Sequence, residues 1–250
     1  TFRVESHEDV VPTLFKACEI AVSGEPGPVF VELPVIVLLL TGEVDELPPF
    51  KPPQAPRLEV AGEVAQAAQL LAVARRPGIF AGWGARDATA ELVRLAEWLE
   101  APVATTLQGL SIFPGNHPLH TGFGFGASAV PSSQNAFREC DCMIAIGTRF
   151  AEIATGSFGT SVPENLIHID INPNAIGANY PARVGIAGDA GAVLRELMQA
   201  PVLHFTACHL ERVLRGNGVG VVLLLENLAL PLAATRLLDV LARRTALEWP

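Results

Sequence analysis

Beyond residue 58 the sequence alternates between short apolar runs, which are typical of buried β-strands, and longer segments with the apolar spacing of amphipathic helices. We expect strands at residues 78–81, 103–106, 142–146, 166–171 and 184–187, and helices at residues 64–74, 88–99 and 190–198. Such alternation predicts an α/β fold, in which helices cover both faces of a parallel sheet. Sheets of this kind bind ligands at the carboxyl ends of their strands, so a site is expected in the turns that follow them.

The first 57 residues follow a different pattern. Residues 7–22 have helical apolar spacing and residues 29–33 form a short β-rich run, which together are too small to fold alone. Residues 48–56 read PPFKPPQAP and predict a linker, because proline lacks an amide donor and suits neither helix nor sheet. After residue 200 the pattern weakens, apart from a helix expected at residues 234–244. We therefore divide the chain into residues 1–40, 41–57, 58–200 and 201–250.

The composition argues against several classes of function. The formal net charge is −9 with 17 Lys and Arg residues, and no basic cluster indicates a nucleic-acid partner. The longest apolar stretch, residues 219–225, is far shorter than the roughly twenty residues that span a bilayer. No Cys or His spacing suits a metal, and the four cysteines are expected to be buried free thiols. These features favour a cytoplasmic protein without a membrane partner or a structural metal.

The turns after the expected strands carry the candidate ligand-binding residues. The turn Gly82-Trp83-Gly84-Ala85 follows a strand and precedes a helix, as phosphate-binding turns do. However, Asp87 stands where the dinucleotide fingerprint has its third glycine, and an ordinary tight turn explains the sequence equally well. The turns after the other strands lie at residues 106–109, 147–150, 170–172 and 188–190. Together these five turns predict a ligand rim along one edge of the sheet.

Three charged residues in these turns suit a nucleotide. Asp170 and Asp189 could accept hydrogen bonds from an adenine amine or a ribose hydroxyl, and Arg149 could pair with a phosphate. Each aspartate suits a helix N-cap equally well. Residues 122–126 read GFGFG and predict a flexible loop, either over a planar ring or at the free surface. His168 alternates with apolar neighbours and is expected to be a hydrogen-bonded core residue.

The order of several motifs resembles the acetolactate synthase group of thiamine-diphosphate-dependent enzymes. Residues 26–34, PGPVFVELP, resemble the end of the pyrimidine-binding domain of that family. The motifs that follow are Arg76-Pro77, Gly82-Trp83-Gly84-Ala85, APVATT at 101–106, FPGNHP at 113–118, IGTRF at 146–150, IHIDINP at 167–173 and Gly188-Asp189-Ala190. The resemblance extends over about residues 5 to 200.

The resemblance implies a six-stranded, parallel, Rossmann-like central domain that holds FAD in a structural role, ADP, or no nucleotide. Carried onto this sequence, the nucleotide contacts of the family fall on Gly82, Trp83, Gly84, Leu107, Gln108, Gly147, Arg149, Asp170, Ile171, Asp189 and Ala190. Ala151-Glu152-Ile153 departs from the two acidic residues and arginine that usually follow Arg-Phe in the flavin enzymes. Ile36 and residues 216–230 also depart from the family pattern, and FAD, ADP and an empty site all stay open.

The same resemblance implies that the whole protein is a carboligase or decarboxylase that uses thiamine diphosphate and Mg²⁺ and acts on a 2-oxo acid such as pyruvate. A homodimer or homotetramer is implied as well. The activating glutamate and the Gly-Asp-Gly to Asn metal motif of the family have no counterpart between Thr1 and Pro250. We therefore expect a fragment that is inactive alone, with both termini cut inside a longer protein.

Three other functions are compatible with the sequence. The chain could be a non-catalytic module that binds FAD or ADP, or a purely structural spacer between catalytic domains. An NAD-dependent oxidoreductase is disfavoured, because the third glycine of the fingerprint and a pair of catalytic proton donors are missing.

Overall fold

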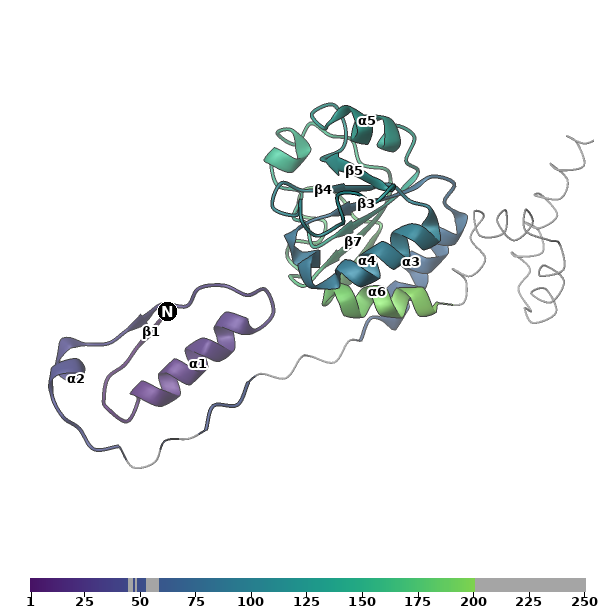
Figure 1. Cartoon of the computed structure of the whole chain (residues 1–250). Coiled ribbons are helices and arrows are strands. Elements are labelled where there is room, and N and C mark those ends of the chain that lie inside the picture. The colour runs from purple at the N-terminus through teal and green to yellow at the C-terminus, as the bar shows by residue number, and fades with distance from the viewer. Residues whose placement is uncertain (45–46, 48, 53–58, 201–250) are drawn as a thin grey trace, which may run out of the picture. The chain divides into compact units, whose positions relative to one another are not determined.

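The computed structural model describes residues 1–44, 47, 49–52 and 59–200 in two compact units, Thr1–Arg57 and Leu58–Pro250 (Figure 1). The helix expected at residues 234–244 and residues 45–46, 48 and 53–57 of the expected linker lie outside the described residues. Within the described part of the chain, no helix is long and apolar enough to cross a membrane.

The first unit contains two short strands and two helices. β1 (Phe2–Arg3) pairs in parallel with β2 (Val31–Glu32), and α1 (Val10–Val22) and α2 (Val35–Leu39) complete the unit. Before α1, the Asp9 carboxylate accepts hydrogen bonds from both the amide and the hydroxyl of Ser6, which fixes the entry to the helix. Both predicted elements are therefore present but shorter than expected. Large apolar side chains remain exposed along the helices, among them Leu14, Ile20, Val22, Val35, Ile36, Leu38 and Leu39.

The second unit is built on a six-stranded parallel sheet. Its strands are β3 (Pro77–Ala81), β4 (Val103–Thr105), β5 (His120–Phe123), β6 (Cys142–Ile146), β7 (Asn165–Asp170) and β8 (Val184–Ala187). Their order across the sheet is β5-β4-β3-β6-β7-β8, and each neighbouring pair is parallel. The chain runs outward in one direction from β3 and in the other from β6. The boundary between β3 and β6 is therefore the switch point at which open α/β sheets collect ligands.

Helices cover both faces of this sheet, as predicted. Figure 1 shows α3 (Ala61–Val73), α4 (Thr89–Leu99) and α6 (Ala190–Gln199) lying together along one face, where they enclose the larger core cluster. The shorter α5 (Pro131–Phe137) packs on the other face, with a second core cluster around Phe80, Phe125 and Phe150. Successive strand residues alternate between the two clusters, because side chains of a strand point to opposite faces. Two short 3-10 helices, η1 (Trp83–Ala88) and η2 (Ile153–Thr155), follow β3 and β6.

The segment expected to be a flexible loop, residues 122–126, instead packs against the second core cluster through Phe125. It contains the end of β5, and Phe125 is only 2% exposed and meets the Phe80 ring edge-on at 4.6 Å. Gly122, Gly124 and Gly126 all have positive φ angles, which glycine adopts without steric cost. The glycines thus bend the chain so that Phe125 turns inward. The expectation of a loop at the free surface is therefore wrong, because glycines at positive φ also allow the bends of a packed segment.

Candidate functional site

The turns after the strands form one continuous border at the carboxyl edge of the sheet. In the turns after β3, β4, β5, β6 and β8, an early amide donates to a carbonyl oxygen at or beside the end of the neighbouring strand. These bonds are Gly124 N to Thr105 O (2.9 Å), Thr106 N to Ala81 O (3.0 Å), Gly82 N to Ile146 O (2.8 Å), Gly147 N to Ile169 O (2.8 Å) and Gly188 N to Asp170 O (3.0 Å). The structure therefore brings all eleven predicted site residues to this one border, which we call the carboxyl rim.

Glycines allow two of these turns to touch at the switch point. A Cβ atom on Gly82 would lie 2.3 Å from the Gly147 carbonyl oxygen, and one on Gly84 would lie 2.7 Å from Gly147 Cα. The amides of Gly82, Gly84 and Ala85 donate to Ile146 O, Gly147 O and Gly82 O. Contact between the turns thus explains these glycines, and their amides are already engaged within the protein.

Exposed apolar side chains stand beside the glycines. Trp83 is 50% exposed, Leu107 48% and Ile171 39%, and they follow the ends of β3, β4 and β7. The Arg86 guanidinium lies 5.3 Å from the centre of the Trp83 ring, a distance that suits a cation–π contact. Gln108 is exposed next to Leu107. The rim therefore offers apolar and planar surfaces around a backbone floor, which suits a flat aromatic ligand.

The two rim aspartates support the backbone. Asp189 caps α6, where its carboxylate accepts a 2.9 Å hydrogen bond from Ala192 N, and Ala190 behind it is buried. Asp170 is 8% exposed, and its Oδ1 accepts a 2.9 Å bond from Asn172 N in the turn after β7. The helix-cap interpretation is confirmed for Asp189, whereas Asp170 stabilises a turn. Each carboxylate retains a second oxygen that could meet a ligand.

Arg149 lies exposed on the turn after β6, between two buried residues. Behind this turn, His168 is 1% exposed and makes two hydrogen bonds, which confirms the predicted core role. Burial lowers the pKa of His168, because desolvation disfavours the imidazolium, although a bond to Thr148 O and the nearby Asp170 charge act in the opposite direction. The imidazole is therefore neutral near pH 7.

The described cysteines are free thiols. Cys18 is exposed on α1, contrary to the expectation that it is buried, whereas Cys142 is buried at the start of β6. Burial raises the pKa of the Cys140 and Cys142 thiols to about 12, so both are protonated and unreactive near neutral pH. Within the ranges that the structure describes, no group of three or more Cys, His, Asp or Glu side chains could hold a metal ion.

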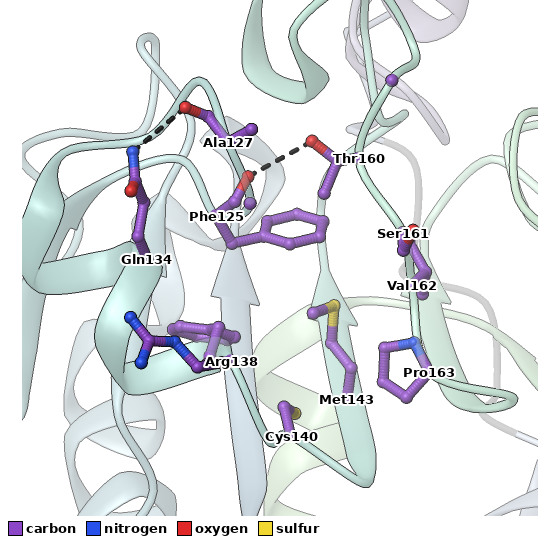
Figure 2. Close-up of a pocket in the computed structure, with 13 residues that line it drawn as sticks. Phe125, Ala127, Gln134, Arg138, Cys140, Met143, Thr160, Ser161, Val162 and Pro163 are labelled. Carbon is purple, nitrogen blue, oxygen red and sulfur yellow. Dashed lines mark hydrogen bonds between the residues drawn. The ribbon is translucent and has the colours of Figure 1, made fainter.

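A separate cleft of about 410 Å³ lies on the α5 face of the sheet (Figure 2). Its apolar wall includes Phe125, Phe137 and Met143, and its polar margin includes Gln134 and Thr160. The Gln134 side-chain amide donates to Ala127 O at 3.0 Å, and the Thr160 hydroxyl donates to Phe125 O at 3.2 Å. None of the predicted site residues lines this cleft, so it is distinct from the carboxyl rim.

Known proteins resemble this chain in sequence and in fold. The family model described as the thiamine pyrophosphate enzyme central domain matches residues 64–197. The chain is 36% identical over 208 residues to the acetolactate synthase large subunit of Corynebacterium glutamicum, covering 79% of this chain and 32% of that protein. It is 38% identical over 207 residues to the acetolactate synthase large subunit of Mycobacterium tuberculosis, with the same two coverages. Both matches extend well beyond a single motif.

A solved structure gives the same fold. The crystal structure of benzoylformate decarboxylase from Polynucleobacter necessarius matches with a TM-score of 0.62 at 23% identity, over 80% of this chain and 38% of that chain. The chain thus spans about a third of the length of the relatives that it matches. These matches, together with the observed strand order, show that the chain belongs to the thiamine pyrophosphate enzyme family and carries the central domain of that family.

Proposed function

We propose that the protein is a thiamine-diphosphate-dependent enzyme that joins or decarboxylates 2-oxo acids such as pyruvate, and that this chain contributes its central scaffold domain. The similarity to acetolactate synthase large subunits, at 36% and 38% identity over 79% of the chain, carries the proposal. By the same similarity we propose a cytoplasmic homodimer or homotetramer. The substrate, the assembly and the location belong to the whole protein.

We propose four segments for this chain. Residues 1–40 would be the end of the pyrimidine-binding domain, 41–57 a linker, 58–200 the central domain, and 201–250 a second linker with the start of the diphosphate-binding domain. The Mg²⁺ and thiamine diphosphate sites of the enzyme would lie outside residues 1–250, because the metal motif of the family has no counterpart in this sequence. Thiamine diphosphate would supply the electron sink for the carbanion chemistry from sites elsewhere in the enzyme.

Within this domain, we propose that the carboxyl rim binds an adenine nucleotide, FAD or ADP, without redox chemistry. The exposed surfaces of Trp83, Leu107 and Ile171 fit an adenine ring, and the exposed Arg149 suits a phosphate. The second oxygens of Asp170 and Asp189 suit ribose or amine donors. An amide cradle for phosphate at Gly82 and Gly84 does not fit, because those amides bond other parts of the protein. The full proposed contact set is that of the eleven rim residues, in which Gly82 and Gly84 would contribute close approach of the backbone and not amide donors.

A second candidate function is a structural spacer that binds nothing. One observation favours it: the rim glycines and both rim aspartates already have structural roles within the protein. In this case the rim would serve only to hold the sheet together and to support contacts with the other domains.

An absorbance scan from about 300 to 550 nm of the freshly purified full chain tests these alternatives, because a bound flavin has a visible band. Mass spectrometry of the small molecules released by heating identifies the ligand. FAD or ADP in the supernatant is the result that we expect. A colourless protein that releases no nucleotide, and that shows no binding of added ADP by calorimetry, would contradict the nucleotide proposal and leave the spacer.

A further inference from the structure

The turn after β6, residues 147–150, has an unusual backbone. Gly147 has φ +57° and Phe150 has φ +51°, so the left-handed region is visited twice within four residues. For a bulky residue such as Phe150 this conformation costs about 1 kcal/mol or more, and it persists only where the surroundings enforce it. Arg149 stands between these two constrained positions. Contacts that fix Gly147 and Phe150 therefore also fix the backbone of Arg149.

Two side chains from later in the chain bond three successive carbonyl oxygens of this turn. His168 Nε2 donates to Thr148 O at 2.7 Å. Asn179 Nδ2 donates to Arg149 O at 2.8 Å and, more weakly, to Phe150 O at 3.4 Å. We call His168 and Asn179 the carbonyl clamp. With these bonds, none of the three carbonyl oxygens depends on water or on a ligand for a donor.

One tautomer of His168 makes both of its hydrogen bonds. Its Nδ1 accepts from Gly177 N at 3.2 Å, so the proton of the neutral ring lies on Nε2 and points at Thr148 O. The imidazole thus links the turn after β6 to the turn after β7, on which Asn179 also lies. Both members of the clamp tie the same two rim turns together.

Aromatic packing fixes the same turn a second time. Phe150 is 0% exposed, and its ring meets His168 edge-on at 5.3 Å and Tyr180 at 5.1 Å. It also stacks on Phe80 at 5.6 Å. Since the Phe150 side chain and the Thr148 carbonyl contact the same imidazole, rotation of the turn would break both contacts. Only the Arg149 side chain of this turn extends from the clamped backbone to the exposed surface.

We propose that His168 and Asn179 are positioning residues, which hold the strained turn so that Arg149 presents its guanidinium at the carboxyl rim to the phosphate of a bound nucleotide. This inference rests on the proposed nucleotide site. A preorganised arginine loses less freedom on binding than a mobile one, so the clamp raises affinity without touching the ligand. The sequence alone does not indicate this role for either residue. Asn179 lies in a polar loop where asparagine is common, and His168 gave only the signal of a core residue.

The test compares full-length variants by ADP calorimetry and by hydrogen exchange of peptides covering residues 147–151. Asn179→Ala removes two clamp bonds, and Asn174→Ala, an exposed residue of the same turn, is the matched control. We expect Arg149→Ala and Asn179→Ala each to weaken ADP binding roughly tenfold, while Asn174→Ala binds like the wild type. Asn179→Ala should also speed exchange at residues 147–151 with little change in the melting temperature.

Conservative changes at His168 separate its two bonds. His168→Gln can still donate an amide N–H near the position of Nε2, and His168→Asn can still accept near the position of Nδ1. Each variant loses one of the two hydrogen bonds. We expect His168→Asn to lose more ADP affinity than His168→Gln, because only His168→Gln keeps the bond to Thr148 O in the turn that carries Arg149. A merely structural role would not produce this order in variants of equal melting temperature.

The outcomes separate the clamp from the nucleotide site. If the wild type binds ADP through Arg149 while the Asn179 and His168 variants bind equally well, the clamp is overturned and the nucleotide site stands. If the wild type binds no nucleotide, the proposed site fails. In that case, if hydrogen exchange at residues 147–151 is unchanged in Asn179→Ala, the clamp is overturned as well. Faster exchange in this variant would show that the clamp stabilises the backbone of the turn without a role in binding.

Discussion

Gly147 shows at the scale of single residues how backbone contact, rather than a ligand, can require glycine. A Cβ atom there would lie 2.5 Å from Gly84 Cα, and the residue also has φ +57°. We predict that Gly147→Ala lowers the free energy of unfolding by about 2 kcal/mol or more, because the clash and the left-handed backbone add. Urea unfolding measures the change. Gly115→Ala, where a Cβ meets nothing within 4 Å, is the control, and equal losses for the two variants would refute the explanation.

His168 makes the stability of the protein depend on pH. Burial lowers its folded pKa, so the unfolded chain takes up the proton more readily. The contribution of neutral His168 to the free energy of unfolding is therefore complete above the pKa that histidine has in the unfolded chain. It is lost as the pH falls from this pKa to the lower pKa of His168 in the folded protein. We predict that the difference in melting temperature between the wild type and His168→Gln narrows over this interval. Parallel curves for the two proteins would show that the buried imidazole does not titrate as described.

At the scale of elements, Asp189 determines how α6 begins. Its carboxylate accepts from Ala192 N, so Asp189→Ala should destabilise the protein by about 1 kcal/mol in urea unfolding. Asp189→Asn retains a capping oxygen without the charge and should cost much less. Asp87→Ala removes only an exposed pair with Arg86 and is the control. If ADP affinity falls in Asp189→Asn while stability does not, the same residue also contacts the ligand.

Two strands, β6 and β8, have the predicted bounds. β6 is buried along its whole length and matches a continuous apolar run, whereas β8 is an edge strand in which Val184 and Ile186 are buried. β5 and α5 were missed because one is a short edge strand containing glycine and the other is a short helix rich in serine and asparagine. Local sequence carries little signal for either element. Their place is determined by tertiary contacts such as those of Phe125 and Phe137.

The same limit applies to the candidate site. Parallel strands end at one edge, so the positions of the rim turns could be predicted from their order along the chain. The pairing of Gly84 with Gly147 and the bonds of Asn179 to the turn after β6 could not, because they join segments that are distant in sequence. The sequence also does not show that the amides of Gly82 and Gly84 already bond carbonyl oxygens of the protein, because these bonds form only in the folded chain.

For the whole protein, we propose that the central domain binds its ligand at the carboxyl rim of the six-stranded sheet. The most direct test is the amide nitrogen–proton NMR spectrum of the full chain as ADP is added. We predict shifts for amides of the rim turns, at Trp83, Leu107, Arg149 and Ile171, and none for Gln134 or Phe137 in the α5-face cleft. Shifts confined to the α5-face cleft, or no shifts at all, would contradict the claim.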